Sequence, residues 1–225
     1  ASHIYETLYE YHYLKRPYEL IPLLAAEMPQ VSDDLTEYTI KIKKGVYFSD
    51  DKCFPGGKGR ELKASDFVYS IKRIANIKNI SRNWSIFQDR IVGLDDFREY
   101  TKTCETKADV DYSKPVEGLR AIDGYTLFIK LNKPWPQMLG TAFADIATTP
   151  VAKEAVDYYG KDLVSNPVGT GPFKLERWER SSYLKLVRNP AFRDEFYPTE
   201  GEESDKENGF FDDAGRKLPL VDSIM

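Results

Sequence analysis

Histidine and cysteine, the side chains that most often bind transition metals, are scarce in this chain of 225 residues. It contains two of each, His3 and His12 near the start and Cys53 and Cys104 farther along. The two cysteines lie 51 residues apart, which excludes the CxxC pattern and leaves open either a disulfide or two separate thiols. With so few ligands at no known spacing, neither a metal site nor a cofactor is predicted. A Ser-His-Asp or Cys-His catalytic group is not indicated either, because no local pattern marks a nucleophile for His12.

The sequence also lacks an excess of basic residues and a long apolar run. Its 32 Lys and Arg residues face 36 Asp and Glu residues, so no basic stripe is present and nucleic acid is not predicted as a partner. Residues 138–152 are the most apolar stretch, but they include Asp145 and Pro150 and are shorter than the roughly 20 apolar residues of a spanning helix. We therefore expect a soluble chain. Its first residues show no signal-peptide pattern, which fits a start inside a longer protein.

Hydrophobic residues make up 41% of the chain, and 15 Tyr, 12 Phe and 3 Trp are among them. That content is sufficient for one large domain or two small ones. Most of the aromatic side chains are expected in the core, and some would suit a pocket that holds a ligand through apolar faces and a few polar tips.

Two periodic segments give the firmest local predictions. Apolar and polar residues alternate over 37–44, as in a strand with one solvated face. Residues 65–77 carry one apolar helical stripe, with Ser65 or Asp66 as the expected cap. Further elements are predicted as helices over 84–92 (ended by Gly93), 137–144 and 152–159 (ended by Gly160) and as strands over 173–177 and 183–188.

A β-hairpin is predicted from 116 to 131. Two strand-like runs, 116–122 and 125–131, are joined by Asp123 and Gly124. Asp-Gly suits a type I′ turn, in which both central residues have positive φ.

The last part of the chain is strongly acidic. Residues 193–213 contain nine acidic residues against two basic ones, Arg193 and Lys206. A run of this kind is usually solvated, so it is predicted to form a surface loop rather than a cation site.

Two motifs that could carry chemistry are weak. Residues 169–171 (Gly-Thr-Gly) lack the third glycine of a dinucleotide-binding loop, and Pro172 and a predicted strand follow them. The adjacent acids at 33–34, 50–51 and 95–96 could act as a hydrolase pair only if neighbouring turn residues pointed together, which they rarely do.

Several longer strings, taken in order, resemble one family. They are IYETLYEY at 4–11, VSDD followed by YTIKIKKGVYFSD within 31–50, LKASDFVYS at 62–70, PVGTGPF at 167–173 and RNPAF at 188–192. They are similar to the family 5 extracellular solute-binding proteins, the oligopeptide-, dipeptide- and nickel-binding components of bacterial ABC importers. The chain departs from the family pattern in an enlarged loop at 52–60 and in an acidic insertion loop at 199–218.

The resemblance implies a mixed α/β (α+β) chain of the periplasmic-binding-protein-like type II class, with a mixed sheet, a β-hairpin and several helices. Residues 1–225 would form a single domain, part of the first lobe with the family's extra subdomain. The second lobe and the C-terminal return to the first would lie outside this sequence. Relatives hold peptide backbones with main-chain and charged groups from both lobes, so this chain would supply one wall of the cleft.

By position, the resemblance points to four candidate contacts in the ligand cleft. Arg82 and Trp84 match the loop after the long helix, and Phe143 and Asp145 match the segment before residues 150–152. Asp145 lies in an apolar stretch, so its carboxylate should either face the cleft or accept a hydrogen bond, because unpaired burial is costly.

The resulting hypothesis is a non-enzymatic binding component of an ABC importer. Its partners would be an oligopeptide, dipeptide or similar solute and the permease subunits of the inner membrane. It would be a monomer, periplasmic or extracellular, with a lipid anchor as an option for the complete protein. Two alternatives stay open, an interaction or signalling module that uses the acidic loop and, more weakly, a hydrolase based on carboxylates such as Asp50 and Asp51.

Overall fold

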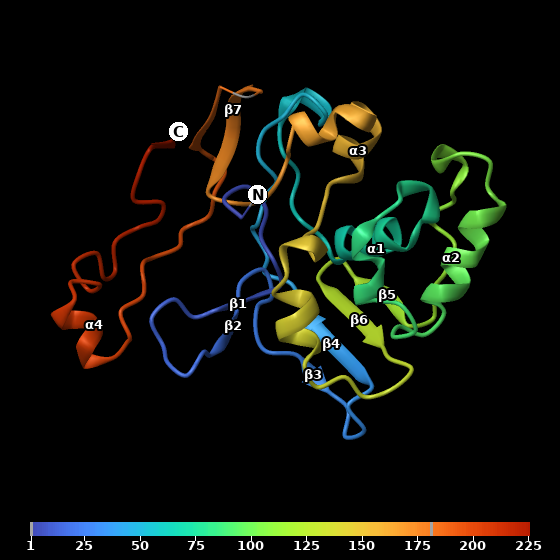
Figure 1. The fold of residues 1–225 in the computed structure, drawn as a ribbon, viewed down its shortest axis with the longest axis horizontal. Coiled ribbons are helices and arrows are strands. Elements are labelled where there is room, and N and C mark those ends of the chain that lie inside the picture. Colours follow the sequence, from blue (N-terminus) through green and yellow to red (C-terminus); the bar gives the residue numbers. More distant parts are fainter. Residues whose placement is uncertain (1, 181) are drawn as a thin grey trace.

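The computed structural model describes residues 2–180 and 182–225 (Figure 1). The strands are β1 (Tyr9–Tyr11), β2 (Leu20–Pro22), β3 (Gln30–Val31), β4 (Glu37–Lys41), β5 (Leu119–Asp123), β6 (Thr126–Lys130), β7 (Phe173–Glu179), β8 (Tyr183–Arg188) and β9 (Ser223–Ile224). The α-helices are α1 (Ala64–Ala75), α2 (Leu94–Thr103), α3 (Lys153–Tyr159) and α4 (Glu203–Glu207). The strands form three sheets, in the orders β1-β2, β3-β4-β6-β5 and β7-β8-β9.

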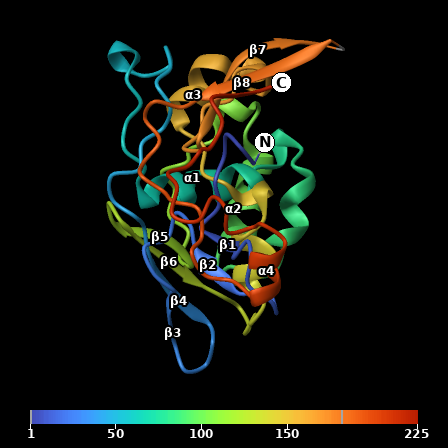
Figure 2. The same cartoon turned by 90° about the vertical axis from the view of Figure 1, so that its left-hand side faces the viewer.

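Every strand pairing in this part of the chain is antiparallel. The resemblance led us to expect a mixed sheet, and this expectation is wrong for the strands described here. Few residues separate β3 from β4, β5 from β6 and β7 from β8, and only antiparallel neighbours can be joined by so short a connection. In both views, β7 and β3 lie at opposite ends of the molecule (Figures 1 and 2).

The four-stranded sheet β3-β4-β6-β5, called the central sheet below, and α1 enclose the main core. The alternation predicted for 37–44 is confirmed, because Tyr38, Ile40 and Ile42 are all buried while their neighbours are more exposed. Helix α1 packs on β5 and β6, and α2 packs on α1 (Figure 1). A smaller cluster formed by Ile4, Phe173 and Leu186 lies under β7 and β8.

The start of α1 differs from the expected cap. Lys63 is the N-cap residue, and its backbone N–H donates to the Asp66 carboxylate at 2.8 Å. Asp66 therefore closes the helix end from inside the first turn, and Ser65 is exposed and is not the cap.

The predicted helix over 84–92 does not form as one element. A 3-10 helix covers Arg82–Ile86, Asp89 then takes a positive φ of 59°, and Gly93 precedes α2 instead of ending a helix. The helical spacing was misleading because Phe87 enters the core from a turn, whereas Ile91 enters it from an antiparallel bridge with Leu131. The segment 137–144 likewise forms only one π-helical turn, Leu139–Phe143.

The hairpin is confirmed, but its turn is not of type I′. Asp123 pairs with Thr126, so Gly124 and Tyr125 are the central residues, and neither has positive φ. The Asp123 carboxylate accepts hydrogen bonds from the Tyr125 N–H at 2.7 Å and the Thr126 hydroxyl at 2.9 Å. This side chain closes the turn in place of an Asp-Gly backbone conformation.

The acidic segment, residues 193–213, is solvated for most of its length, as predicted. It contains the short helix α4, which lies on the opposite side of the molecule from α2 (Figure 1). Lys15, in the loop between β1 and β2, forms an ion pair with Glu200 at 3.1 Å. Arg193 and Glu195 are the exceptions, because their side chains are largely enclosed.

Both cysteines are free thiols and partly buried. Burial, together with the adjacent Asp51 carboxylate, raises the pKa of Cys53 to about 12. This thiol is therefore a poor nucleophile at neutral pH. Within residues 2–180 and 182–225, no helix has the length and apolar character needed to cross a membrane.

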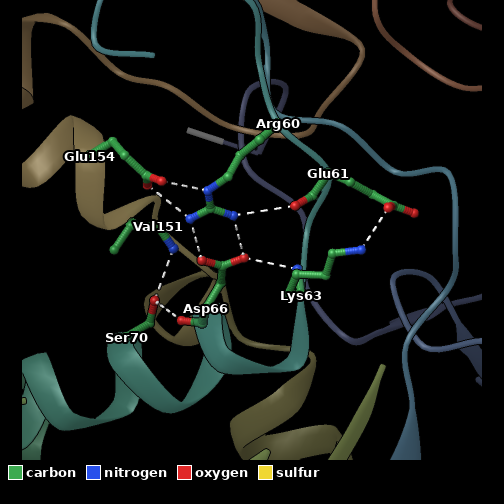
Figure 3. A network of polar contacts seen from close by, with 7 residues as sticks. All are labelled: Arg60, Glu61, Lys63, Asp66, Ser70, Val151 and Glu154. Atoms are coloured by element: carbon green, nitrogen blue, oxygen red, sulfur yellow. Dashed lines mark hydrogen bonds and ion pairs between the residues drawn. The ribbon is translucent and has the colours of Figure 1, made fainter. Parts of the chain in front are cut away.

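Arg60 joins α1, α3 and the loop before α1 (Figure 3). Its guanidinium group donates to the Asp66 carboxylate at 2.9 and 2.7 Å and to the Glu154 carboxylate at 2.6 and 2.8 Å. Asp66 is only 4% exposed. Ser70, one turn later in α1, accepts a hydrogen bond from the Val151 N–H at 2.9 Å and so adds a second link to the segment before α3.

Replacing Arg60 tests whether this network holds the elements together. Arg60→Met should lower the free energy of unfolding by about 2–4 kcal/mol, because it leaves the buried Asp66 carboxylate without its counter-ion. Urea unfolding measures the change. Lys58→Met is the matched control, since Lys58 pairs with Asp50 on the surface and should cost less than about 1 kcal/mol. Equal losses for the two variants would contradict a structural role for the network.

Candidate functional site

A hollow of about 360 Å³ lies where the segment before β1 meets the end of the chain. Its walls come from the segment leading into β1, from the turn around residue 145 and from the segment after β8. The lining residues are Ser2, Tyr5, Glu6, Thr7, Glu10, Leu23, Ala144, Ile146, Pro172, Phe192, Glu195, Leu218 and Pro219. This combination of apolar walls and a few carboxylates is typical of a ligand pocket.

The Gly-Thr-Gly string positions one wall of the pocket. The Gly171 N–H donates to the Ile4 carbonyl at 2.8 Å, and the Phe173 N–H donates to the His3 carbonyl at 3.0 Å. A Cβ atom at Gly169 would lie 2.1 Å from the Ile4 oxygen, so only glycine allows this close approach of the two backbones. The motif therefore has a packing role, and it fixes the residues that lead to Glu6.

Arg193 pairs with two carboxylates of the pocket, those of Glu6 and Glu195. Its guanidinium group donates to both oxygens of Glu6, at 2.9 and 2.7 Å, and to Glu195 at 2.8 Å through Nε. Glu6 is only 6% exposed. Burial raises the pKa of Glu6, and the hydrogen bonds and charge of Arg193 oppose that shift.

A third carboxylate, that of Glu10, lines the same pocket, so three carboxylates lie near the two cations Arg193 and Lys43. Lys43 lies 3.8 Å from Glu195, and burial lowers its pKa. Glu10 keeps contact with solvent at the mouth. The crowding of protein atoms that partly buries its carboxyl group, followed by the charges of Glu195 and Glu6, raises its pKa to about 7. The arrangement suits a ligand group that carries positive charge or donates hydrogen bonds.

Among the residues that the structure describes, no group of three His, Cys, Asp or Glu side chains is arranged to hold a metal ion.

The segment 143–146 reaches the pocket, but through other residues than predicted. Ala144 and Ile146 line it. Phe143 is only 1% exposed and packs on Phe87 with ring centroids 6.3 Å apart, so its side chain belongs to the core. Asp145 is exposed, and its carboxylate accepts a hydrogen bond from the Ala147 N–H at 2.7 Å.

Arg82 and Trp84 do not line this pocket. Arg82 is exposed on its 3-10 helix. Trp84 is half-buried against the main core, and the Arg98 guanidinium group stacks over its ring at 4.6 Å. The structure therefore does not bring the four candidates together into one cluster.

Glu6, Glu10 and Glu195 were not predicted from the sequence as residues of this site. The sequence did contain a signal for Glu6, because it lies in the apolar segment 4–9. Like Asp145, a carboxylate in an apolar stretch is costly to bury without a partner. No such signal existed for Arg193 and Glu195, because they belong to an acidic run, and such runs are usually exposed to solvent.

Comparison with known proteins places this chain among the solute-binding proteins. Residues 19–224 match the family described as bacterial extracellular solute-binding proteins, family 5, middle part. The glutathione-binding proteins GsiB of Escherichia coli O157:H7 and Salmonella typhi are 28% identical over 165 residues and 26% identical over 163 residues. Each alignment covers 72% of this chain and 25% of the relative.

Solved structures give the same indication. The pheromone receptor PrgZ, described with its mode of peptide binding, matches with a TM-score of 0.65 and 26% identity over 85% of this chain and 34% of its own. DppA from Helicobacter pylori in complex with the peptide STSA matches with a TM-score of 0.60 and 26% identity over 84% and 34%. Listeria monocytogenes OppA bound to peptide matches with a TM-score of 0.65 and 25% identity over 84% and 33%. The chain thus spans about a quarter of these curated relatives and a third of these solved chains.

Removing Arg193 should destabilise the fold strongly. Arg193→Met leaves the Glu6 carboxylate buried without a counter-ion, and we expect a loss of about 3–5 kcal/mol in the free energy of unfolding. Arg188→Met, at an exposed pair with Asp222, should lose less than about 1 kcal/mol. In the double variant Glu6→Gln/Arg193→Met the loss should be about 1–3 kcal/mol smaller than the sum of the single losses. Simple additivity, measured by denaturant unfolding, would show that the two groups are not coupled.

Glu10 predicts a stability change near neutral pH. Because its pKa in the folded chain is raised from 4.5 to about 7, the folded state binds the proton more tightly than the unfolded state does. Its contribution to stability is fully present below about pH 4.5 and is lost as the pH rises through about 7. Glu10→Gln should remove this fall from the profile of Tm against pH and be the more stable protein at pH 8. Parallel profiles for the two proteins between pH 5 and 8 would refute the assignment.

Proposed function

Since this chain belongs to the bacterial extracellular solute-binding proteins of family 5 and has the periplasmic-binding-protein-like type II fold, we propose that it forms one wall of a peptide-binding cleft. The family consists of solute-binding proteins rather than enzymes, so the hydrolase alternative is not retained. The relatives extend well beyond the matched region, and in this proposal the facing lobe comes from sequence outside these 225 residues.

The acidic pocket is the observation that carries the proposal. Glu6 and Glu195 share one arginine, and Glu10 adds a carboxylate at the open mouth. The ammonium group of a peptide would supply the missing positive charge and would hold the Glu10 carboxylate in its ionised form. Tyr5 and Phe192, which line the same hollow, offer apolar faces for an adjacent side chain.

The four ligand contacts expected from the sequence have different places in the proposed cleft. Asp145 is retained as a contact, because it is exposed between the two pocket residues Ala144 and Ile146. Arg82 and Trp84 would touch a ligand only if the cleft continued along their 3-10 helix. Phe143 would support the wall from the core.

The transport role follows from the family and is part of the proposal. Family 5 proteins serve importers and bind their solutes outside the cytoplasm, so we place this chain in the periplasm or at the extracellular surface. Closure of two lobes around the ligand would present it to the membrane permease. A lipid anchor would belong to the complete protein.

Native mass spectrometry of the complete gene product, purified gently from its host, tests the ligand class. A ladder of released peptide masses is expected. One discrete non-peptide adduct would replace the peptide assignment with a dedicated small solute. A bare protein that shows no thermal shift with mixed peptides would instead favour an interaction module that uses the acidic segment.

Two variants locate the ligand once peptides are found. Glu10→Gln should weaken peptide binding about tenfold, because it removes a charge-assisted hydrogen bond, and Asp145→Ala should weaken it without lowering Tm. Asp194→Asn is the matched control, since its carboxylate is exposed and outside the pocket. Calorimetric titration measures all three. Unchanged affinity in Glu10→Gln would remove the pocket from the site.

A further inference from the structure

A second hollow, of about 540 Å³, lies between α1, the segment 107–113 and α3. It shares no lining residue with the acidic pocket. Its lining residues are Tyr69, Arg73, Asn79, Lys107, Ala108, Val110, Asp111, Tyr112, Ser113, Lys153, Val156, Asp157 and Gly160. Its volume lies in the range of small-molecule sites.

Arg73 and Lys107 bring positive charge to this hollow, and among the described residues neither forms an ion pair with an acidic side chain. Arg73 is half-buried on α1, and its guanidinium group makes no ion pair or hydrogen bond with any residue in the ranges 2–180 and 182–225. Lys107 is exposed at the rim and is unpaired within the same ranges. A half-buried guanidinium group usually has a carboxylate or phosphate partner, because its planar fork matches either group.

The acidic residues of the hollow are already engaged. Asp157 pairs with Lys153 through their terminal groups. Asp111 accepts hydrogen bonds from the Ser113 N–H at 2.8 Å and from the Ser113 hydroxyl at 2.6 Å. The Asp111 carboxylate keeps its negative charge, because these hydrogen bonds lower its pKa. Arg73, Lys107 and Lys153 together outnumber Asp111 and Asp157, so the net charge of the lining is positive.

The remaining walls are apolar and fixed in place. Tyr69 and Tyr112 meet edge to face with centroids 4.9 Å apart, and the Tyr112 hydroxyl accepts a hydrogen bond from Asn76 at 2.8 Å. Val110 and Val156 complete the apolar surface. An apolar body next to an anionic group would fit this surface.

We propose that this hollow is a second binding site, for a small organic carboxylate with an apolar body. Arg73 would hold the carboxylate, with Lys107 adding attraction from the rim. The inference does not rest on the proposed peptide cleft, because it uses different residues and a ligand of opposite charge.

Calorimetric titration of the complete gene product with 3-phenylpropionate tests the site. Binding with a Kd of about 1 mM or tighter is expected, and the neutral 3-phenylpropionamide should bind at least tenfold more weakly. Arg73→Gln should weaken 3-phenylpropionate binding about tenfold. Lys107→Glu, on an exposed side chain, should also weaken it, whereas Lys133→Gln, on an exposed side chain outside the lining, should leave it unchanged.

Three results would overturn the proposal. The first is equal binding of the acid and the amide. The second is unchanged affinity in both Arg73→Gln and Lys107→Glu, with folding confirmed by circular dichroism. The third is binding of inorganic phosphate in preference to 3-phenylpropionate, which would replace the carboxylate class. Because Glu10→Gln leaves this hollow intact, loss of peptide binding in that variant together with retained 3-phenylpropionate binding would separate the two sites.

Discussion

The ion pair between Arg193 and Glu6 is the interaction on which the site depends. It joins the beginning of the chain to the segment after β8, residues that lie 187 positions apart. A carboxylate that is 6% exposed cannot remain charged there without a counter-ion. By satisfying Glu6 and Glu195 together, one guanidinium group sets the shape of the pocket and leaves Glu10 as the carboxylate without a cation of its own.

Glycine residues, rather than large side chains, allow the close packing of the backbone near this ion pair. The backbone of residues 3–4 lies directly against the Gly-Thr-Gly string, where a Cβ atom would collide. Arg60 plays a comparable part for the larger core, since it connects α1 to α3 through two carboxylates (Figure 3). In both places an arginine fork secures segments that are distant in sequence.

Periodicity and resemblance predicted much of the fold. The strand around Ile40, the helix carrying Phe67 and Ile71 and the hairpin around Asp123 could be read locally, because each depends on neighbours in sequence. The helix expected over 84–92 failed because tertiary packing, not helical period, places Phe87 and Ile91. For the candidate pocket, Ala144 and Ile146 line the wall, whereas the contacts predicted in that segment were Phe143 and Asp145. The role of Arg193 could not be predicted, because its burial depends on a contact with Glu6 across almost the whole chain.

A structure of the complete gene product with its co-purified ligand would test the central claim most directly. We expect the ligand to occupy the acidic pocket, with a positively charged group within hydrogen-bonding distance of Glu10 or Glu195. A ligand bound elsewhere, with the pocket filled by another part of the protein, would contradict it.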